Sequence, residues 1–464
     1  MLSKTILFWG IVFVLVGWMG CATHRVDPAR PRSRPLGDDF PVFRPPAKPD
    51  DSPQGTFPTE EPSGALTLRQ ALALALMNNP DLAAFSWEIR AQEAATLQAG
   101  LHSNPEIAAD MQDINGSGAS IDGVRQPQTT LQISQLIEMG GKRSKRREVA
   151  SLTRDLAGWD YETKRIDIFT QISQAFIDVL SAQQNLALTE ETVRLAEQVA
   201  EVVSERVTAG KVSPVEEAKA NVALSSAEIE LDRARRELEA ARNRLAATWG
   251  GATPRFERAE GDLGPVSPIP SLAQIALRLS QNPDLARWAA EISQRRAVID
   301  LEKSKAIPDI NLMGGYRRYN TSDDGVFIVG ISLPLPIFNR NQGGIREARD
   351  RLAKGKEERR AAEARVAAGL AEAYKSLSSA HAEVTALREK ILPRAQSAFD
   401  AVNEGYRLGK FGLLDVLDAQ RTFFSSRAQH LRALTDYHQA VAEIERLIGE
   451  RLESGGQGSG VGGR

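Results

Sequence analysis

Two aspartates near the carboxyl-terminal end of the chain have the spacing of a functional pair. Asp415 and Asp418 are three residues apart, so on a helix they lie one turn apart on the same face. Two carboxylates in a narrow, poorly solvated site repel each other and attract cations. They can equally be ordinary solvated acids at the start of a helix, where the helix dipole favours negative charge. The residues alone leave both interpretations open.

Other residue types that carry chemistry do not form a recognisable catalytic set. Gly140 to Arg143 resembles a phosphate-binding loop only superficially, because Leu136 stands where the leading glycine belongs and Arg143 replaces the hydroxyl residue. The histidines lack the spacing of metal ligands; they are His24, His102, His381, His430 and His438. We therefore expect no enzyme, no cofactor and no dedicated metal site.

The charge of the chain argues against a polyanionic partner. The net charge is −2 and charged residues make up 25% of the chain, so no nucleic-acid partner is expected. The basic run at 142–147 lies in a segment rich in both signs and is most simply the solvated end of a helix. Aromatic residues are only 6%, while Ala, Leu and Glu are abundant, which favours long helices.

Hydrophobic periodicity predicts very long helices and short strands as the elements that position these residues. In the first half we expect helices at 66–101 with a break near Asn79-Pro80, strands at 105–112 and 129–137, and helices at 142–207 and 214–249. In the second half we expect helices at 271–305 with a break near Asn282-Pro283, strands at 309–319 and 326–335, and helices at 344–408 and 413–452. The longest of these would measure about 100 Å. Leu and Ala alternate along 224–245 at the three-and-four spacing of a coiled coil.

The second half of the chain repeats the first. The sequence Asn79–Ala83 returns as Asn282–Ala286, and Gly210-Lys211 returns as Gly409-Lys410, about 200 residues later. Both halves have the same order of short helix, two strands and two long helices. A repeat of this length predicts two similar units placed side by side by pseudo-symmetry.

The four predicted strands have the length needed to cross an outer membrane at a tilt. Four strands cannot close on themselves, and open strand edges are not tolerated in lipid. Three copies of the chain would supply twelve strands, which is a permitted barrel size. A soluble sheet packed on helices is the alternative for the same strands.

The amino-terminal end has the features of an export signal. Lys4 is followed by the apolar run Ile6–Val16, which is too short to cross a bilayer. Cys21, the only cysteine, directly follows a small residue at the end of this region, as in a lipoprotein signal. Ordinary signal cleavage beside an incidental cysteine is the alternative.

The chain ends are therefore divided as follows. We expect a signal peptide at 1–20, a lipidated amino terminus and Pro-rich tether at 21–65, and a Gly-rich disordered tail at 453–464. After Cys21 there is no apolar run long enough for a transmembrane helix.

Several segments together resemble the TolC family of outer-membrane efflux proteins. They are Leu66–Ala71 (LTLRQA), the paired NPD segments, the paired hairpins, and above all Gly405–Lys410 (GYRLGK) followed by Leu414–Ala419 (LDVLDA). The resemblance covers residues 66–452, with one efflux repeat at 66–260 and a second at 261–452. The segment Gln135–Arg143 is similar to the branch that serves heavy-metal exporters of the resistance-nodulation-division type.

This resemblance implies a mainly α-helical chain with a small β part, assembled as a homotrimer. Three chains would form a 12-stranded β-barrel in the outer membrane lipid, continued by a long coiled-coil tunnel across the periplasm. Such a trimer is a passive exit duct, served by a periplasmic adaptor protein and an inner-membrane resistance-nodulation-division pump. Heavy-metal cations are the expected substrate. A multidrug or type I secretion duct is the alternative, and a periplasmic coiled-coil scaffold is a more distant one.

The resemblance also implies roles for individual residues. Asp415 and Asp418 would line the periplasmic constriction of the duct. In some relatives a basic residue at the position of Phe411 locks the closed gate by salt bridges, so that lock is not expected here. The expected adaptor-docking turns are the two helix-hairpin tips: Gly210, Lys211, Val212, Ser213, and Leu408, Gly409, Lys410, Phe411, Gly412.

Overall fold

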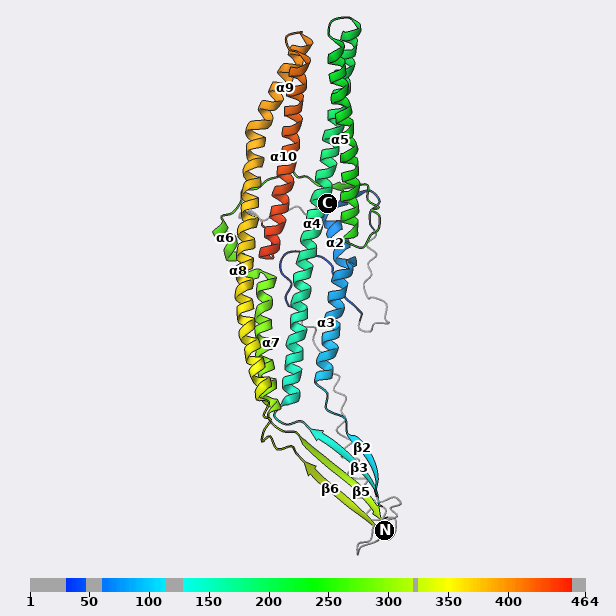
Figure 1. Ribbon diagram of the computed structural model, residues 1–464, viewed down its shortest axis with the longest axis vertical. Coiled ribbons are helices and arrows are strands. Elements are labelled where there is room, and N and C mark those ends of the chain that lie inside the picture. The colour runs from blue at the N-terminus through cyan, green and yellow to red at the C-terminus, as the bar shows by residue number, and fades with distance from the viewer. Residues whose placement is uncertain (1–30, 47–60, 113–127, 320–323, 453–464) are drawn as a thin grey trace.

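The molecule is built around one very long helix. The computed structural model describes residues 31–46, 61–112, 128–319 and 324–452. Helix α4 (Lys142–Thr208) has 67 residues and is therefore about 100 Å long. It runs from a sheet at one end of the molecule towards the helix tips at the other (Figure 1). Helices α3, α5, α7 and α10 all pack against it.

Each half of the chain supplies a similar series of elements. The first half contains β1 (Ala65–Thr67), α2 (Leu68–Asn78), α3 (Pro80–Ala99), β2 (Glu106–Gln112), β3 (Gln128–Ile137), α4 and α5 (Pro214–Ala247). The second half contains β4 (Arg258–Glu260), α6 (Leu272–Leu277), a 3-10 turn (Arg278–Gln281), α7 (Pro283–Lys305), β5 (Ile310–Tyr319), β6 (Gly325–Ser332), α8 (Gln342–Ala386), α9 (Leu392–Arg407) and α10 (Leu413–Ile448). The long helices and both strand pairs lie where the hydrophobic pattern predicts them.

The two predicted helix breaks are matching asparagine joints. The side-chain oxygen of Asn79 accepts the N–H of Leu82 at 3.0 Å, and that of Asn282 accepts the N–H of Leu285 at 2.9 Å. Proline follows each asparagine at the first helical position, where its missing N–H costs nothing. The asparagine amides also donate to backbone carbonyls at the ends of α5 and α10. Each joint therefore ties a short helix to the base of a long hairpin.

The second long hairpin differs from the first because it contains a π-turn. The pattern predicts one helix over 344–408, but α8 and α9 are joined by a π-turn at Leu387–Ile391. Pro393 lies in the first turn of α9, where it lacks an N–H and its ring clashes with the carbonyl four residues earlier. The wider turn absorbs this misfit. Helix α4 passes the corresponding level without a break.

Two predicted element ends are also corrected. Strand β6 ends at Ser332 and not at 335, because Pro334 and Pro336 have no N–H to offer a neighbouring strand. Helix α10 ends at Ile448 and not at 452, because Gly449 adopts the left-handed conformation with φ of 69°.

The strands of both halves form one four-stranded antiparallel sheet. Its order is β2-β3-β5-β6, so the two hairpins are joined where β3 pairs with β5. That pairing runs from Gln128 opposite Tyr319 to Ile137 opposite Ile310. A second, parallel pair is formed by β1 and β4 near the middle of the molecule, and the sequence pattern did not predict it.

A buried ion pair holds the amino-terminal segment onto α4. The guanidinium of Arg165 donates to the carbonyl oxygens of Leu36 and Gly37 at 2.8 and 2.9 Å. The same guanidinium pairs with Glu162 at 2.7 Å, and the two side chains are only 2% and 3% exposed. Glu162 also accepts the N–H of Arg34 at 2.6 Å. The described part of the Pro-rich tether is therefore fixed to the helix, which its composition did not predict.

This ion pair makes a stability prediction. Arg165→Met should destabilise the fold by about 3–5 kcal/mol, because Glu162 is left buried without its cation. The double change Arg165→Met/Glu162→Gln removes both charges and should recover most of that loss. Thermal unfolding of the purified proteins in detergent measures the stability of both variants. Trypsin should cut residues 31–46 faster in the single variant. Equal destabilisation of the two variants would show that the charge pair is not what fixes the segment.

Candidate functional site

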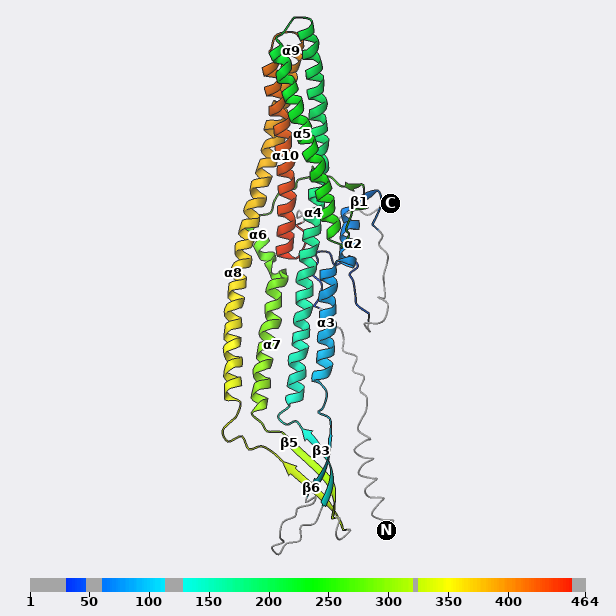
Figure 2. The same cartoon turned by 45° about the vertical axis from the view of Figure 1, so that its right-hand side comes forward.

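The two long hairpins end in matching tips (Figures 1 and 2). Gly210 and Gly409 close the tips in the left-handed conformation, with φ of 61° and 73°. In each tip the next residue, Lys211 or Lys410, donates its N–H back across the turn, at 2.9 and 2.7 Å. This is the Schellman end that glycine permits. A side chain built on either glycine would meet no atom within 4 Å, so both tips are open to a partner.

The helices that return from the tips begin in different ways. Ser213 precedes Pro214 at the start of α5, and its hydroxyl accepts the N–H of Val215 at 3.3 Å. Helix α10 follows Gly412, and the carboxylate of Asp415 accepts the Gly412 N–H at 2.9 Å. Asp415 therefore has a local role in starting its helix. This is the plainer of the two interpretations of that residue, and it is compatible with the other.

The remaining predicted tip residues lie at the surface. Asp415 and Asp418 are both exposed on α10, one turn apart. Leu408 is 61% exposed and Phe411 is 45% exposed. A Cβ on Gly405 would lie 2.3 Å from the ring of Phe411, so this ring packs on the glycine of its own tip. Phe411 thus fills the turn that leads into α10.

A small apolar cluster and one arginine join the two tips. The tip cluster consists of Val203, Ala220, Tyr406, Leu413 and Val416. Beside it, the Arg206 guanidinium on α4 donates to the Tyr406 carbonyl oxygen at 3.2 Å and lies 4.3 Å from the Tyr406 ring centroid. The sequence analysis missed this contact. The signal that could have found it is the repeat, since the two residues lie at nearly equivalent positions of the two halves.

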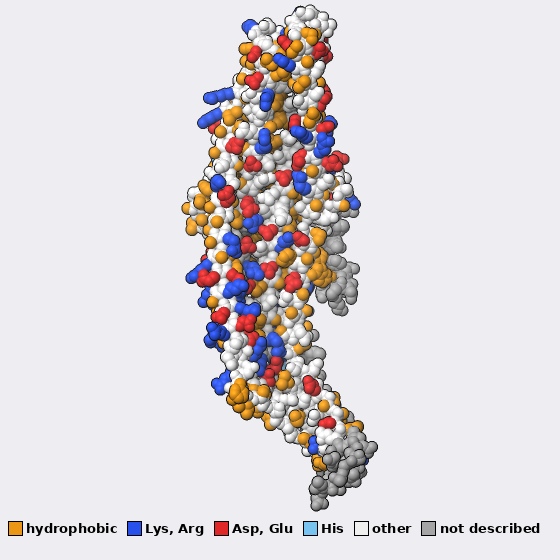
Figure 3. Space-filling view, viewed as in Figure 1, with side chains coloured by type: hydrophobic (Ala, Val, Ile, Leu, Met, Phe, Trp, Pro, Cys, Tyr) orange, Lys and Arg blue, Asp and Glu red, His pale blue; other side chains and the backbone are white. Residues whose placement is uncertain are grey.

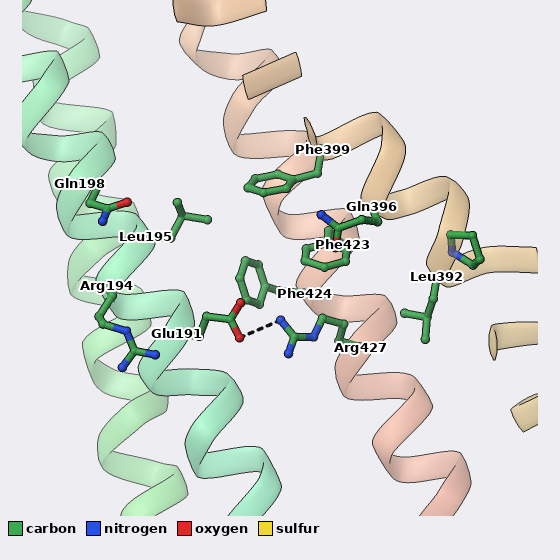
Figure 4. Close-up of a pocket in the computed structure, with 11 residues that line it drawn as sticks. Glu191, Arg194, Leu195, Gln198, Leu392, Gln396, Phe399, Phe423, Phe424 and Arg427 are labelled. Carbon is green, nitrogen blue, oxygen red and sulfur yellow. Dashed lines mark hydrogen bonds and ion pairs between the residues drawn. The ribbon is translucent and has the colours of Figure 1, made fainter. Parts of the chain in front are cut away.

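An aromatic pocket of about 740 Å³ lies beside the π-turn, between α4, α9 and α10. Figure 4 shows Phe399 and Phe423 on one side and Glu191 and Arg427 in the middle. The two phenyl rings are stacked with centroids 5.5 Å apart, and Arg427 pairs with Glu191 at 2.8 Å. The ion pair connects the first hairpin to the second, so this pocket lies on the boundary between them.

A longer groove of about 1320 Å³, with both apolar and polar side chains in its lining, lies between α5 and α10 along α4. Its lining includes hydroxyl, amide and charged side chains of both signs: Asp178, Ser181, Asn185, Thr189, Glu230, Arg233, Arg421, Ser425 and Arg432. On α10, Arg421 and Ser425 follow Asp418 at helical spacing. Asp418 therefore lies at the tip end of this row of polar side chains on α10.

The four-stranded sheet has one mainly apolar face and one mainly polar face. The register places these exposed side chains on the apolar face: Ile107, Met111, Leu131, Ile133, Leu312, Tyr316, Phe327, Val329 and Ile331. The other face carries Glu106, Asp110, Gln112, Gln128, Thr130, Gln132, Ser134, Asn311 and Arg317. The first face also carries Thr129, Gln135 and Arg318, and the second also carries Leu136, Met313, Val326 and Ile328. In Figure 3, charged side chains crowd the helices and become sparse over the sheet. Such a sheet suits a wall between lipid and water.

Two histidines of α10, His430 and His438, are half-buried. His438 Nε2 lies 2.9 Å from the Leu263 carbonyl oxygen, and burial lowers the pKa of His438. Burial and the nearby Arg388 lower the pKa of His430. Across the described ranges, no group of three or more His, Cys, Asp or Glu is placed to hold a metal ion. Cys21 lies outside these ranges.

No helix in the described part of the chain has an apolar stretch suited to crossing a membrane.

Comparison with known proteins agrees with this arrangement. The chain is 36% identical over 395 residues to the cobalt-zinc-cadmium resistance protein CzcC of Cupriavidus metallidurans, covering 85% of this chain and 92% of that protein. It is 29% identical to the nickel-cobalt-cadmium resistance protein NccC of Alcaligenes xylosoxydans xylosoxydans, over 70% and 71% of the two chains.

The fold is also that of solved structures. The structure of CusC, described in terms of transmembrane channel formation, matches with a TM-score of 0.70 and 19% identity over 89% of this chain and 99% of that one. The family model described as outer membrane efflux protein matches twice, at residues 71–251 and 275–450. With its twin hairpins and two-faced sheet, the chain belongs to the outer membrane efflux protein family.

Proposed function

We propose that three copies of this chain form the outer-membrane exit duct of a heavy-metal efflux system. The observation that carries the proposal is the two-faced sheet at one end of the α-helical hairpins. An apolar face needs lipid, whereas a polar face needs water. A sheet with these two faces suits the wall of a water-filled path for ions, and the groove along α4, which carries charged and hydroxyl side chains, lies further along the helices. The chain carries out no covalent step in this function.

The open sheet edges support a trimer. Within the described sheet, β2 and β6 each have a neighbour on one side only. Unpaired backbone groups in lipid cost several kcal/mol each, so both edges need partner strands. Three chains would close twelve strands, with β6 of one chain beside β2 of the next. The same arrangement would place three copies of each hairpin around one axis.

The substrate class follows from the acidic tip and from the relatives. Two relatives of this chain are named for resistance to cobalt, zinc, cadmium and nickel. In a trimer, Asp415 and Asp418 would form two rings of three carboxylates at the periplasmic entrance, which favours the passage of cations over anions. Phe411 cannot form an ionic lock there. The tip cluster and the contact of Arg206 with Tyr406 would hold the closed entrance together instead.

The open tips suit the adaptor and the pump. Both glycine turns project beyond the helices and carry an exposed lysine, Lys211 or Lys410. A periplasmic adaptor that binds these two similar turns would connect the duct to an energised inner-membrane pump. Lipid on Cys21 would add a membrane anchor to a barrel that is already inserted.

The function is tested by a susceptibility panel on a deletion strain of the native host. We expect several-fold greater sensitivity to divalent metal ions, reversed by the wild-type gene. Asp415→Asn/Asp418→Asn should restore resistance less well, because the charges are lost while asparagine can still accept the Gly412 N–H. Asp415→Glu/Asp418→Glu is the charge-retaining control. Sensitivity to drugs without sensitivity to metals would move the duct to the multidrug class.

Adaptor docking is tested separately at the tips. Gly210→Trp and Gly409→Trp should leave the trimer intact but strongly reduce chemical cross-linking to the adaptor, because a bulky side chain would occupy the open space above each turn. Gly210→Asn and Gly409→Asn are the matched controls, since asparagine tolerates the left-handed conformation without that bulk. Undiminished cross-linking of both tryptophan variants would rule out docking at these turns.

A further inference from the structure

The connection between β6 and α8 is an apolar segment whose exposure the fold does not explain. Residues 333–338 read Leu-Pro-Leu-Pro-Ile-Phe. Leu335, Ile337 and Phe338 are 72%, 62% and 89% exposed. Figure 3 shows hydrophobic side chains gathered on this side of the molecule, at the corner where the helices meet the sheet. Large side chains with this exposure need an apolar partner.

The segment continues the apolar face of the sheet. On β6 the alternate residues Phe327, Val329 and Ile331 point to that face and are 65%, 89% and 64% exposed. Beyond the end of the strand, Leu333 and Leu335 keep the same alternation in the sequence, and Leu333 is 47% exposed. The run of exposed apolar side chains thus extends past the paired strand into the connection.

The paired part of β6 is too short for the membrane it would cross. Its 8 residues span about 23 Å along the strand, which at a tilt of about 40° covers about 18 Å of height. The apolar band of an outer-membrane barrel is about 25 Å tall. The difference between the height of β6 and that of the apolar band is about 7 Å. Leu333–Phe338 follows the strand on the side of the helices and would fill this difference.

The backbone of the segment is adapted to a place with little water. Pro334 and Pro336 have no N–H that would need a partner. The N–H of Ile337 donates to the Leu335 carbonyl oxygen at 2.8 Å. The carbonyl oxygens of Pro336 and Phe338 accept from the side chains of Arg340 and Gln342, both at 3.1 Å. Such pairing is what a segment in the hydrocarbon region requires.

The first half of the chain has a weaker copy of the same feature. Ile137 at the end of β3 and Met139 after it are 39% and 38% exposed, and the exposed basic residue Arg143 follows them on α4. After the apolar segment of the second half, exposed Arg340 and Arg346 follow in the same way. Exposed apolar side chains at the strand-to-helix connection, followed by arginine, fit the boundary between acyl chains and phosphate headgroups.

We propose that Leu333–Phe338 is a membrane-interface anchor. Its side chains insert among the acyl chains of glycerophospholipids in the periplasmic leaflet of the outer membrane, and Arg340 lies at the level of their phosphates. The proposal rests on the proposed function, because it takes the apolar face of the sheet as the face towards lipid. In a trimer the anchor would occur three times around the base of the barrel.

Lipid quenching of introduced tryptophans tests the anchor. Phe338→Trp, Val329→Trp and Leu277→Trp replace side chains that are 89%, 89% and 82% exposed, in the connection, on the strand and on the helical body. Each full-length variant is reconstituted in vesicles of phosphatidylethanolamine and phosphatidylglycerol with brominated acyl chains. We expect quenching beyond that of the parent protein at positions 338 and 329, and none at 277. Ile337→Trp provides a second probe if the variant at 338 does not fold.

The outcomes separate the anchor from the duct. Quenching at 329 without quenching at 338 and 337 would overturn the anchor, show that a neighbouring copy covers the segment, and leave the duct in place. Failure of quenching at all of these positions would overturn both proposals. Quenching at 277 equal to that at 338 would mean that the lipid contact is non-specific, which also overturns the anchor.

Discussion

Every backbone polar group that enters hydrocarbon needs a partner, and this constraint explains more of the chain than any single contact. It requires that strands at membrane depth pair on both edges. The two hairpins meet this requirement between themselves where β3 pairs with β5, and in the proposed trimer the outer edges would pair with neighbouring copies. Where pairing stops after Ser332, Pro334 and Pro336 remove two donors that would otherwise lack partners. In the proposed duct the sheet would therefore require assembly.

The two halves have the same order of elements, but their long helices differ in regularity. Both halves use an asparagine joint at the base of the hairpin and a glycine turn at its tip. Only the second long hairpin of the described chain has a π-turn, and Glu191 and Arg427 join the two hairpins beside it. A helix is most easily redirected where its regular hydrogen-bond ladder is already broken. The geometry therefore places a bend in α8–α9 while α4 stays straight through the same level.

Much of the fold follows from periodicity, because helices and strands this long leave a repeated signal. The helix breaks at Asn79 and Asn282 and the turns at Gly210 and Gly409 are predictable, since proline and glycine restrict the backbone locally. The buried site of Arg165 and Glu162 is not predictable in this way. The Arg165 guanidinium also donates to carbonyl oxygens of a distant segment, and that segment has little hydrophobic signal. The contact of Arg206 with Tyr406 was missed for a similar reason, as it joins two helices far apart in the chain.

The candidate gate depends on assembly. Asp415 accepts a backbone N–H within its own helix turn, and Asp418 lies exposed beside it. In the proposed trimer, neighbouring copies would turn these two surface acids into rings. A duct must also attract its substrate weakly enough to release it. Exposed carboxylates, each free to keep most of its hydration, suit that task better than a closed set of ligands, so selectivity is expected to reside in the assembled entrance and in what the pump delivers.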